Sequence, residues 1–237
     1  MKRIFISALI TLLFLQVNAQ NTIVIDTAIS TDPAASAKKK PYWLSTSELI
    51  LSGASVENNG VKMDNIVRFS AFFHVGEQVH FDFSNKAGFY TGISLRNVGM
   101  INDLNDSVRI KQRVYTVGIP AAFKVGNMQG TNLAVGAEAE FAIAYKQKVF
   151  VNDEKSKTNE WFSDRTNIFL PSAFAEIRTK QGGYIKFKYY LTDFLVEDKQ
   201  KVNGTTQTFV PTQSKMFYVS FGYALGAKDA NKYKSKI

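Results

Sequence analysis

From Ser47 onward, apolar and polar residues alternate with a period of two, which is the pattern of β-strands. The clearest stretch runs from Leu133 to Lys146, where Leu, Val, Ala, Phe, Ile and Tyr at odd positions alternate with Ala, Gly, Glu and Lys at even ones. Eight such segments follow one another along the chain. We predict strands at 48–56, 66–84, 89–100, 110–124, 133–146, 168–180, 185–192 and 215–225.

The connections between these segments alternate in length. Short turns near 85–88, 127–131 and 181–183 are separated by longer polar connections near 57–64, 101–109, 150–166 and 198–213. An even number of strands with this short–long alternation is typical of outer-membrane barrels, which have short periplasmic turns and longer external loops. The pattern predicts an all-β fold: a closed antiparallel up-and-down transmembrane β-barrel of about eight strands over residues 45–226.

The residues before the first strand predict export. Lys2 and Arg3 precede an apolar run, Ile4 to Leu15, and Val17-Asn18-Ala19 fits a signal-peptidase cleavage site. We predict a signal peptide at 1–19, a flexible leader at 20–44 and a basic tail at 227–237. These features favour the outer membrane of a Gram-negative-type bacterium as the location.

The direction in which the apolar face points separates a membrane barrel from a soluble one. In a lipocalin-like ligand-binding barrel the apolar face turns inward, whereas in a membrane barrel it meets lipid. Phe and Tyr are frequent on the apolar faces, and the opposite faces carry small residues and charges of both signs. This favours the membrane barrel over the soluble alternative. The predicted lipid-facing residues are Phe69, Ile93, Leu95, Val117, Phe141, Ile143, Phe187, Val219 and Phe221.

An eight-stranded barrel has an interior just wide enough to be filled by side chains. Charges placed there must pair and form hydrogen bonds, because an unpaired buried charge is costly. The expected ion-pair network comprises Arg68, Arg96, Glu138, Glu140, Lys146, Glu176, Arg178, Lys186 and Lys188. Since this set has a surplus of basic groups, a selective anion path through the barrel is the functional alternative to a plugged lumen.

Composition narrows the function classes. The chain carries a formal net charge of +9 but no Cys, which excludes disulfides, thiolate metal sites and a thiol nucleophile. Export removes most of the case for nucleic acid as a partner of the basic chain. We expect no cofactor, no metal site and no nucleic acid. The expected partners are outer-membrane lipid and an envelope protein, and the oligomeric state is left open.

Several sequence blocks resemble a broad family of small bacterial outer-membrane β-barrel proteins, mostly of unknown function. They are Phe72-Phe73-His74-Val75-Gly76, His80-Phe81-Asp82-Phe83-Ser84-Asn85, Thr91 to Gly99, Arg113 to Pro120 and Phe187 to Phe194. The resemblance covers nearly all of 45–226. It implies the barrel fold but no catalytic residues, and some relatives are accessory barrels of a protein-secretion pathway.

Candidate catalytic residues are few. His74 and His80 are the only histidines, and a lipid-modifying enzyme would need a His base next to a Ser nucleophile and an acidic group. Ser84 and Asp82 share one strand face with His80, but residues i and i+4 of a strand are about 13 Å apart. We therefore predict a structural or interaction barrel without enzymatic activity, with a narrow charge-filled lumen and with the external loops as its contact surface. A lipid-modifying enzyme and a secretion accessory remain the alternatives.

Overall fold

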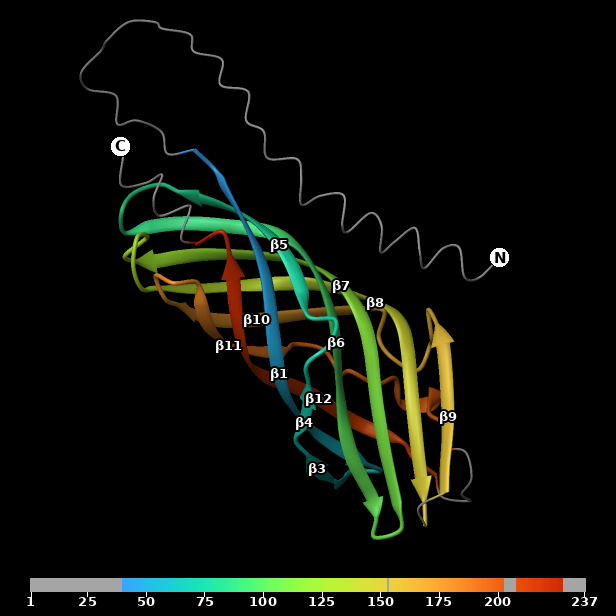
Figure 1. Ribbon diagram of the computed structural model, residues 1–237. Coiled ribbons are helices and arrows are strands. Elements are labelled where there is room, and N and C mark those ends of the chain that lie inside the picture. The colour runs from blue at the N-terminus through green and yellow to red at the C-terminus, as the bar shows by residue number, and fades with distance from the viewer. Residues whose placement is uncertain (1–39, 153, 203–207, 228–237) are drawn as a thin grey trace, which may run out of the picture. The chain divides into compact units, whose positions relative to one another are not determined.

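The computed structural model describes residues 40–152, 154–202 and 208–227, and its main feature is a closed ring of eight antiparallel strands (Figure 1). Neighbouring strands of the ring pair in chain order, and β8–β10 and β12–β1 pairing completes it. This confirms the predicted closed antiparallel up-and-down barrel. The ring strands are β1 (Tyr42–Asn58), β5 (Val75–Asp82), β6 (Ala87–Asn105), β7 (Val108–Gly126), β8 (Asn132–Val151), β10 (Phe169–Arg178), β11 (Gly183–Tyr190) and β12 (Pro211–Leu225).

The predicted signal peptide, the leader up to residue 39 and the tail from residue 228 lie outside the described residues. Strand β1 begins at Tyr42, within the segment predicted as leader. Among the described residues, no helix is long and apolar enough to cross a membrane.

The two ends of the barrel differ in their connections. At one end, which we call the short-turn end, lie the turns 83–86, 127–131 and 179–182 and both ends of the described chain. The turns 83–86 and 127–131 contact each other, since the Met128 N–H donates to Asn85 O at 2.9 Å, and the turn 179–182 contacts β12, since the Ala224 N–H donates to Gly182 O at 2.8 Å. We call the opposite end the long-strand end, because β6, β7, β8 and β9 (Glu154–Trp161) run there together (Figure 1).

Two connections predicted as loops are mostly strand. The prediction of a loop at 101–109 is wrong, since β6 and β7 are paired up to Asn105 and Val108. The prediction at 150–166 is wrong for the same reason, because β8 and β9 pair from Ala144↔Trp161 to Val151↔Glu154. Asp103, Arg109, Lys155 and Lys157 lie on the outer face of this extended sheet, so polarity alone did not separate a loop from a solvated strand.

The second predicted strand is broken into three pieces. Strands β3 (Asp64–Ile66) and β4 (Arg68–Ser70) pair with β6 and β1 respectively, and residues 71–74 bulge out before β5 starts. Phe73 adopts φ 63° in this bulge, a left-handed conformation that is unfavourable for a bulky residue. The short strand β2 (Val61–Lys62) turns back on β1 at the long-strand end.

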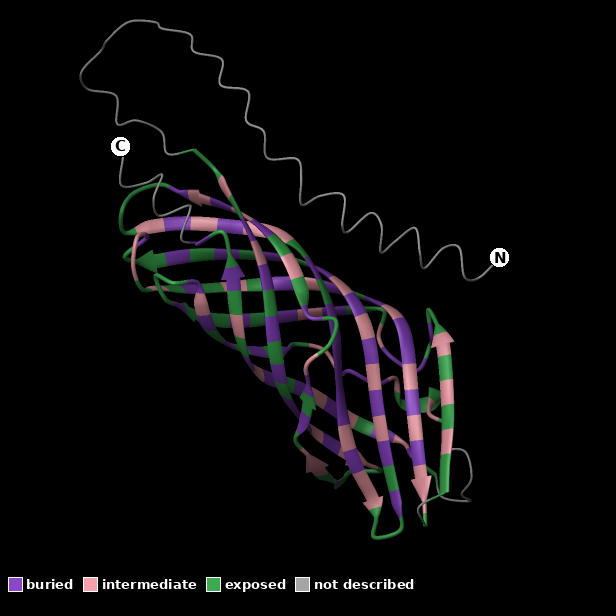
Figure 2. Cartoon of the chain, in the orientation of Figure 1, coloured by how far each residue is buried: buried purple, intermediate pink, exposed green. Residues whose placement is uncertain are grey.

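Burial alternates along most of the ring strands (Figure 2), except at 96–100 of β6, where five consecutive residues are buried. The chemistry of the two faces reverses between the barrel ends. In the half towards the short turns, Phe, Leu, Ile and Val are exposed and charged residues are buried. In the other half the interior is an apolar layer, and the exposed positions of β7 to β9 are largely polar. The largest members of this apolar layer are Ile50, Met100, Ile110, Tyr145, Leu170, Tyr190, Phe194, Met216 and Tyr218.

The reversal on β8 is produced by a bulge. Tyr115 pairs with Ala144 and Thr116 with Ala142, so Ile143 has no partner on β7. Before this bulge the even residues of β8 point inward, and after it the odd ones do, from Tyr145 to Val149. One inserted residue therefore exchanges the faces of the strand.

Candidate functional site

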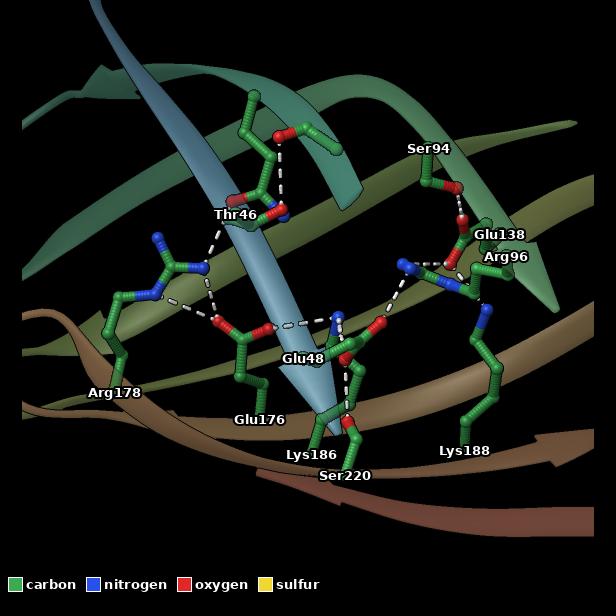
Figure 3. Close-up of polar contacts among 12 residues, drawn as sticks. Thr46, Glu48, Ser94, Arg96, Glu138, Glu176, Arg178, Lys186, Lys188 and Ser220 are labelled. Carbon is green, nitrogen blue, oxygen red and sulfur yellow. Dashed lines mark hydrogen bonds and ion pairs between the residues drawn. The ribbon is translucent and has the colours of Figure 1, made fainter. Parts of the chain in front are cut away.

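The most elaborate polar structure lies inside the barrel, around Arg96 of β6 (Figure 3). Its guanidinium lies 2.5 Å from Glu48 Oε1, 3.4 Å from Glu138 Oε2 and 3.4 Å from Glu140 Oε1. Since Glu48 belongs to β1 and the other two carboxylates to β8, one side chain connects three strands of the ring. Gly118 of β7 leaves room for this arrangement, because a Cβ there would collide with the carboxylate of Glu138.

Lys188 of β11 approaches the same two carboxylates of β8. Its Nζ lies 2.5 Å from Glu138 Oε2 and 2.9 Å from Glu140 Oε1. The remaining carboxylate oxygens accept hydrogen bonds from the hydroxyls of Ser94 and Tyr190. Glu138 and Glu140 therefore have both cationic and hydroxyl partners, as buried carboxylates require.

A second group continues the cluster towards the short-turn end. Lys186 Nζ lies 3.3 Å from Glu176 Oε2 and 3.7 Å from Glu48 Oε2, and Ser220 donates to Glu48 Oε2 at 2.6 Å. Arg178 binds Glu176 Oε1 through two nitrogens, at 2.6 and 3.0 Å. We call the eight charged residues the inner network: Glu48, Arg96, Glu138, Glu140, Glu176, Arg178, Lys186 and Lys188.

The charges of the inner network balance. Four carboxylates face four cations, and each of these residues is at most 5% exposed. Seven of the nine residues predicted for the lumen are in it, and Glu48 is a member that the sequence prediction missed. Glu48 could have been found, because Leu49 and Leu51 on the outer face of β1 place it on the inner one.

Two predicted members lie elsewhere. Lys146 points outward beyond the β8 bulge and lies 5.0 Å from the ring centre of Tyr115. Arg68 donates to the main-chain and side-chain oxygens of Asn97, at 3.2 and 3.0 Å, where β4 has no ladder pairing with β6. Among the described residues neither forms an ion pair. With these corrections, the surplus of basic groups that suggested an anion path is no longer present in the inner network.

The nine residues predicted to face lipid are all exposed or partly exposed. Six of them are large apolar residues with exposed side chains, and Val117, Ile143 and Val219 have intermediate exposure. Together with their neighbours they form what we call the apolar belt, the outer surface around the short-turn half of the barrel. Aromatic residues border it on both sides. On the short-turn side they are Trp43, Phe83 and Phe123, and on the long-strand side Phe72, Phe73, Trp161 and Phe162.

The long-strand opening of the barrel is closed by the segment 191–202, which we call the mouth segment. Phe194 and Leu195 insert into the apolar layer and are at most 2% exposed. Arg165 holds the segment by donating to Lys201 O at 3.2 Å and to Gln147 Oε1 at 2.9 Å. Gln200 in turn donates to Arg165 O at 2.6 Å. Apolar insertion and polar bonds thus fix the segment over the interior.

Replacing Arg165 with Ala is expected to loosen the mouth segment. The loss of buried hydrogen bonds costs about 2 kcal/mol locally, so exchange of the Phe194, Leu195 and Val196 amides becomes about 30-fold faster. Hydrogen exchange measured by mass spectrometry checks this. Lys199→Ala is the control, because its 3.9 Å contact with Asp164 is exposed. Equal exchange rates of these amides in the two variants would contradict the role of Arg165 in holding the mouth segment.

The candidate trio around His80 does not form a catalytic site. His80 is buried between the rings of Tyr42 and Tyr90, and its Nδ1 lies 3.1 Å from Lys124 Nζ. Ser84 is in an exposed turn, where its hydroxyl accepts the main-chain N–H groups of residues 86 and 87. His80 and Ser84 therefore contact different groups. Within the described part of the chain, no cluster of three or more His, Asp or Glu could hold a metal ion.

A Ser–His contact that the sequence did not indicate lies at the bulge before β5. His74 Nε2 is 2.7 Å from Ser70 Oγ, and the Asn97 N–H donates to His74 Nδ1 at 3.3 Å. Because Nδ1 accepts this bond, the neutral imidazole carries its proton on Nε2 and donates it to Ser70. A general base would have to accept the proton of the serine instead. Ser70 and His74 are both buried, and their hydrogen bonds link β4 to β6 where the two strands have no ladder pairing.

Replacing Ser70 with Ala is therefore expected to affect stability alone. It leaves the buried His74 Nε2–H without its acceptor, which costs about 1–2 kcal/mol in the free energy of unfolding. Urea titration of the purified protein measures this loss. The acyl composition of the host envelope lipid, followed by mass spectrometry, should be identical for the wild type and S70A. A modification produced only by the wild type would contradict the structural role.

No family model and no curated protein sequence matches the chain significantly. Solved structures do. Ail, the attachment invasion locus protein of Yersinia pestis, is 12% identical, with 77% of this chain and 99% of that chain covered and a TM-score of 0.33. Neisserial surface protein A is 11% identical, with coverages of 78% and 98% and a TM-score of 0.38. The outer membrane protein OprG from Pseudomonas aeruginosa is 10% identical, with coverages of 79% and 97% and a TM-score of 0.36. Outer-membrane proteins of bacteria, the class that the sequence blocks resemble, are thus among the solved structures to which the chain is similar.

Proposed function

We propose that this chain is an integral outer-membrane protein whose barrel is an anchor with a sealed interior, and whose long-strand end is the surface that meets partners. The observation that carries the proposal is the reversal of polarity along β7. Its outer face is basic up to Arg113, changes at Tyr115, and is apolar from Val117 to Val125. A barrel surrounded by water over its whole length would not expose so large a continuous apolar surface.

The dimensions of the apolar belt support the same assignment. From Tyr115 to Phe123, β7 covers about 26 Å of strand, which corresponds to about 20 Å along the membrane normal at a tilt of about 40°. This is close to the apolar band of outer-membrane barrels, about 25 Å, and aromatic residues border it as they border lipid interfaces. The short turns and both ends of the described chain then face the periplasm, and the mouth segment faces outward.

The filled interior supports a non-conducting barrel. The balanced inner network occupies one half, while the apolar layer and the mouth segment occupy the other. Eight strands leave little space beyond what side chains fill. The proposed function therefore includes neither porin activity nor an anion path. It is interaction with partners through the long-strand end.

Two measurements test this function. After lysis, the protein should remain with the membrane in carbonate and leave it only in detergent; recovery in the soluble periplasm would contradict the anchor. In planar bilayers the wild type should give no steady conductance. A stable, ion-selective current that persists in the wild type would contradict the sealed interior.

The alternatives of a lipid-modifying enzyme and of a secretion accessory have no specific observation in their favour. The Ser70–His74 pair has the donor direction opposite to that of a nucleophile and its base. We therefore keep a non-enzymatic interaction role as the proposal.

A further inference from the structure

A compact group of basic side chains covers the outer face of β7, β8 and β9 directly beyond the apolar belt. We call it the basic face: Lys111, Arg113, Lys146, Lys148, Lys155 and Lys157. Pairing of these three consecutive strands brings the six residues together, so they do not form a single run of charges in the sequence. All six side chains are exposed or partly exposed.

The strand register places like charges opposite one another. Lys111 pairs with Lys148, and Lys148 with Lys157, so three ammonium groups form one row across three strands. Arg113 pairs with Lys146 in the adjacent row. Directly opposed like charges destabilise a sheet, and here they occur in two rows.

Within the described part of the chain, none of these six residues forms an ion pair with a carboxylate. Nearby Arg109 is different, because it binds Asp103 at 2.6 Å and is therefore not counted in the basic face. Partial burial and the charges of Lys155, Arg113, Lys157 and Lys111 lower the pKa of Lys148. The cost of this arrangement is offset if an anion binds there.

The height of the basic face indicates which anion. Trp161 is on the outer face of β9, with Asn159 and then Lys157 beyond it, so the charges begin a few residues above the aromatic border of the belt. In a bilayer this is the level of the lipid headgroups. Lys111 lies 4.9 Å from the ring centre of Phe150 on the same outer face.

We propose that the basic face binds the phosphate groups of a glycolipid in the outer leaflet of the membrane. Three opposed ammonium groups at headgroup level match a ligand that carries more than one phosphate. The acyl chains of the same molecule would lie against the apolar belt below. The inference rests on the proposed function, since it needs the belt to be in a bilayer.

The test uses the full-length protein and bis-phosphorylated lipid A as the probe. The variant K111Q/K148Q/K157Q removes the central row, and K62Q/K199Q/K201Q is the control, because it removes equal charge from residues outside the basic face. Native mass spectrometry with titrated lipid A gives apparent affinities. We expect the central-row variant to bind about tenfold to hundredfold more weakly than the wild type, and the control within about twofold.

Further arms separate the outcomes. Lipid A without phosphates should bind no better to the wild type than to the central-row variant. Equal lipid A affinity of wild type and central-row variant would overturn the inference, and so would binding of soluble sulfated polysaccharide without binding of lipid A. Vesicle flotation is run on every variant: loss of insertion by the wild type contradicts the proposed function, whereas insertion without phosphate preference contradicts only this inference.

Discussion

Replacing Arg96 with Met is expected to lower the free energy of unfolding by about 3–5 kcal/mol, the largest effect of any single substitution proposed here. The guanidinium contacts three buried carboxylates, and its loss leaves their charge undercompensated beside the apolar layer. Methionine keeps most of the side-chain volume, so the loss reports charge rather than a cavity. Urea unfolding of the barrel in detergent micelles, followed by tryptophan fluorescence, measures the difference.

Arg109→Met is the matched control for this substitution. Arg109 also binds a carboxylate, that of Asp103 at 2.6 Å, but its side chain is 48% exposed. An exposed pair contributes about 0–1 kcal/mol, so the control should remain close to the wild type. Losses of similar size in R96M and R109M would contradict a cooperative inner network.

Replacing Ile119 with Arg is expected to cost about 2–4 kcal/mol in lipid bilayers, because the residue lies midway along the belt portion of β7 and a cation there would be placed in hydrocarbon. Its side chain is 54% exposed, so the substitution leaves the interior untouched. Refolding of the protein in vesicles at increasing urea concentration gives the free energy difference.

Val61→Arg provides the comparison. Val61 is 70% exposed and apolar, but it lies in β2 at the long-strand end, beyond the belt. The same change should cost less than about 0.5 kcal/mol there. If I119R and V61R were equally tolerated in vesicles, the outer surface at Ile119 would not be in contact with lipid.

The alternation of apolar and polar residues predicted the ring of strands because each strand has one apolar and one polar or small face over its belt portion. The same logic found seven members of the inner network, since charges on a face opposite Phe, Ile and Val have only the interior to occupy. It placed Lys146 wrongly because a single inserted residue at Ile143 exchanges the faces of β8. A bulge of this kind leaves no sign in a period-two pattern that remains apolar on both sides.

The long-strand half was harder to predict for a different reason. There the interior is apolar and the outside polar, so the segments 101–109 and 150–161 resemble solvated loops although they are paired strands. The basic face and the Ser70–His74 contact depend on register and on a bulge, and neither is encoded by spacing in one segment. Both features are formed by pairing between strands. The sequence predicts which strands are neighbours but not the register in which they pair.

The central claim is that the barrel exposes lipid-facing residues on one half and water-facing residues on the other, with the change at the β8 bulge. Because the chain has no Cys, single cysteines carrying nitroxide labels can be introduced along β8 from Leu133 to Val151. In bilayers, collision with oxygen should be high at odd positions from 133 to 143, and collision with a water-soluble nickel reagent should be high at 146, 148 and 150. High accessibility to the nickel reagent at Phe141 would contradict the account. So would high oxygen collision at the odd positions continuing past the bulge to residue 149.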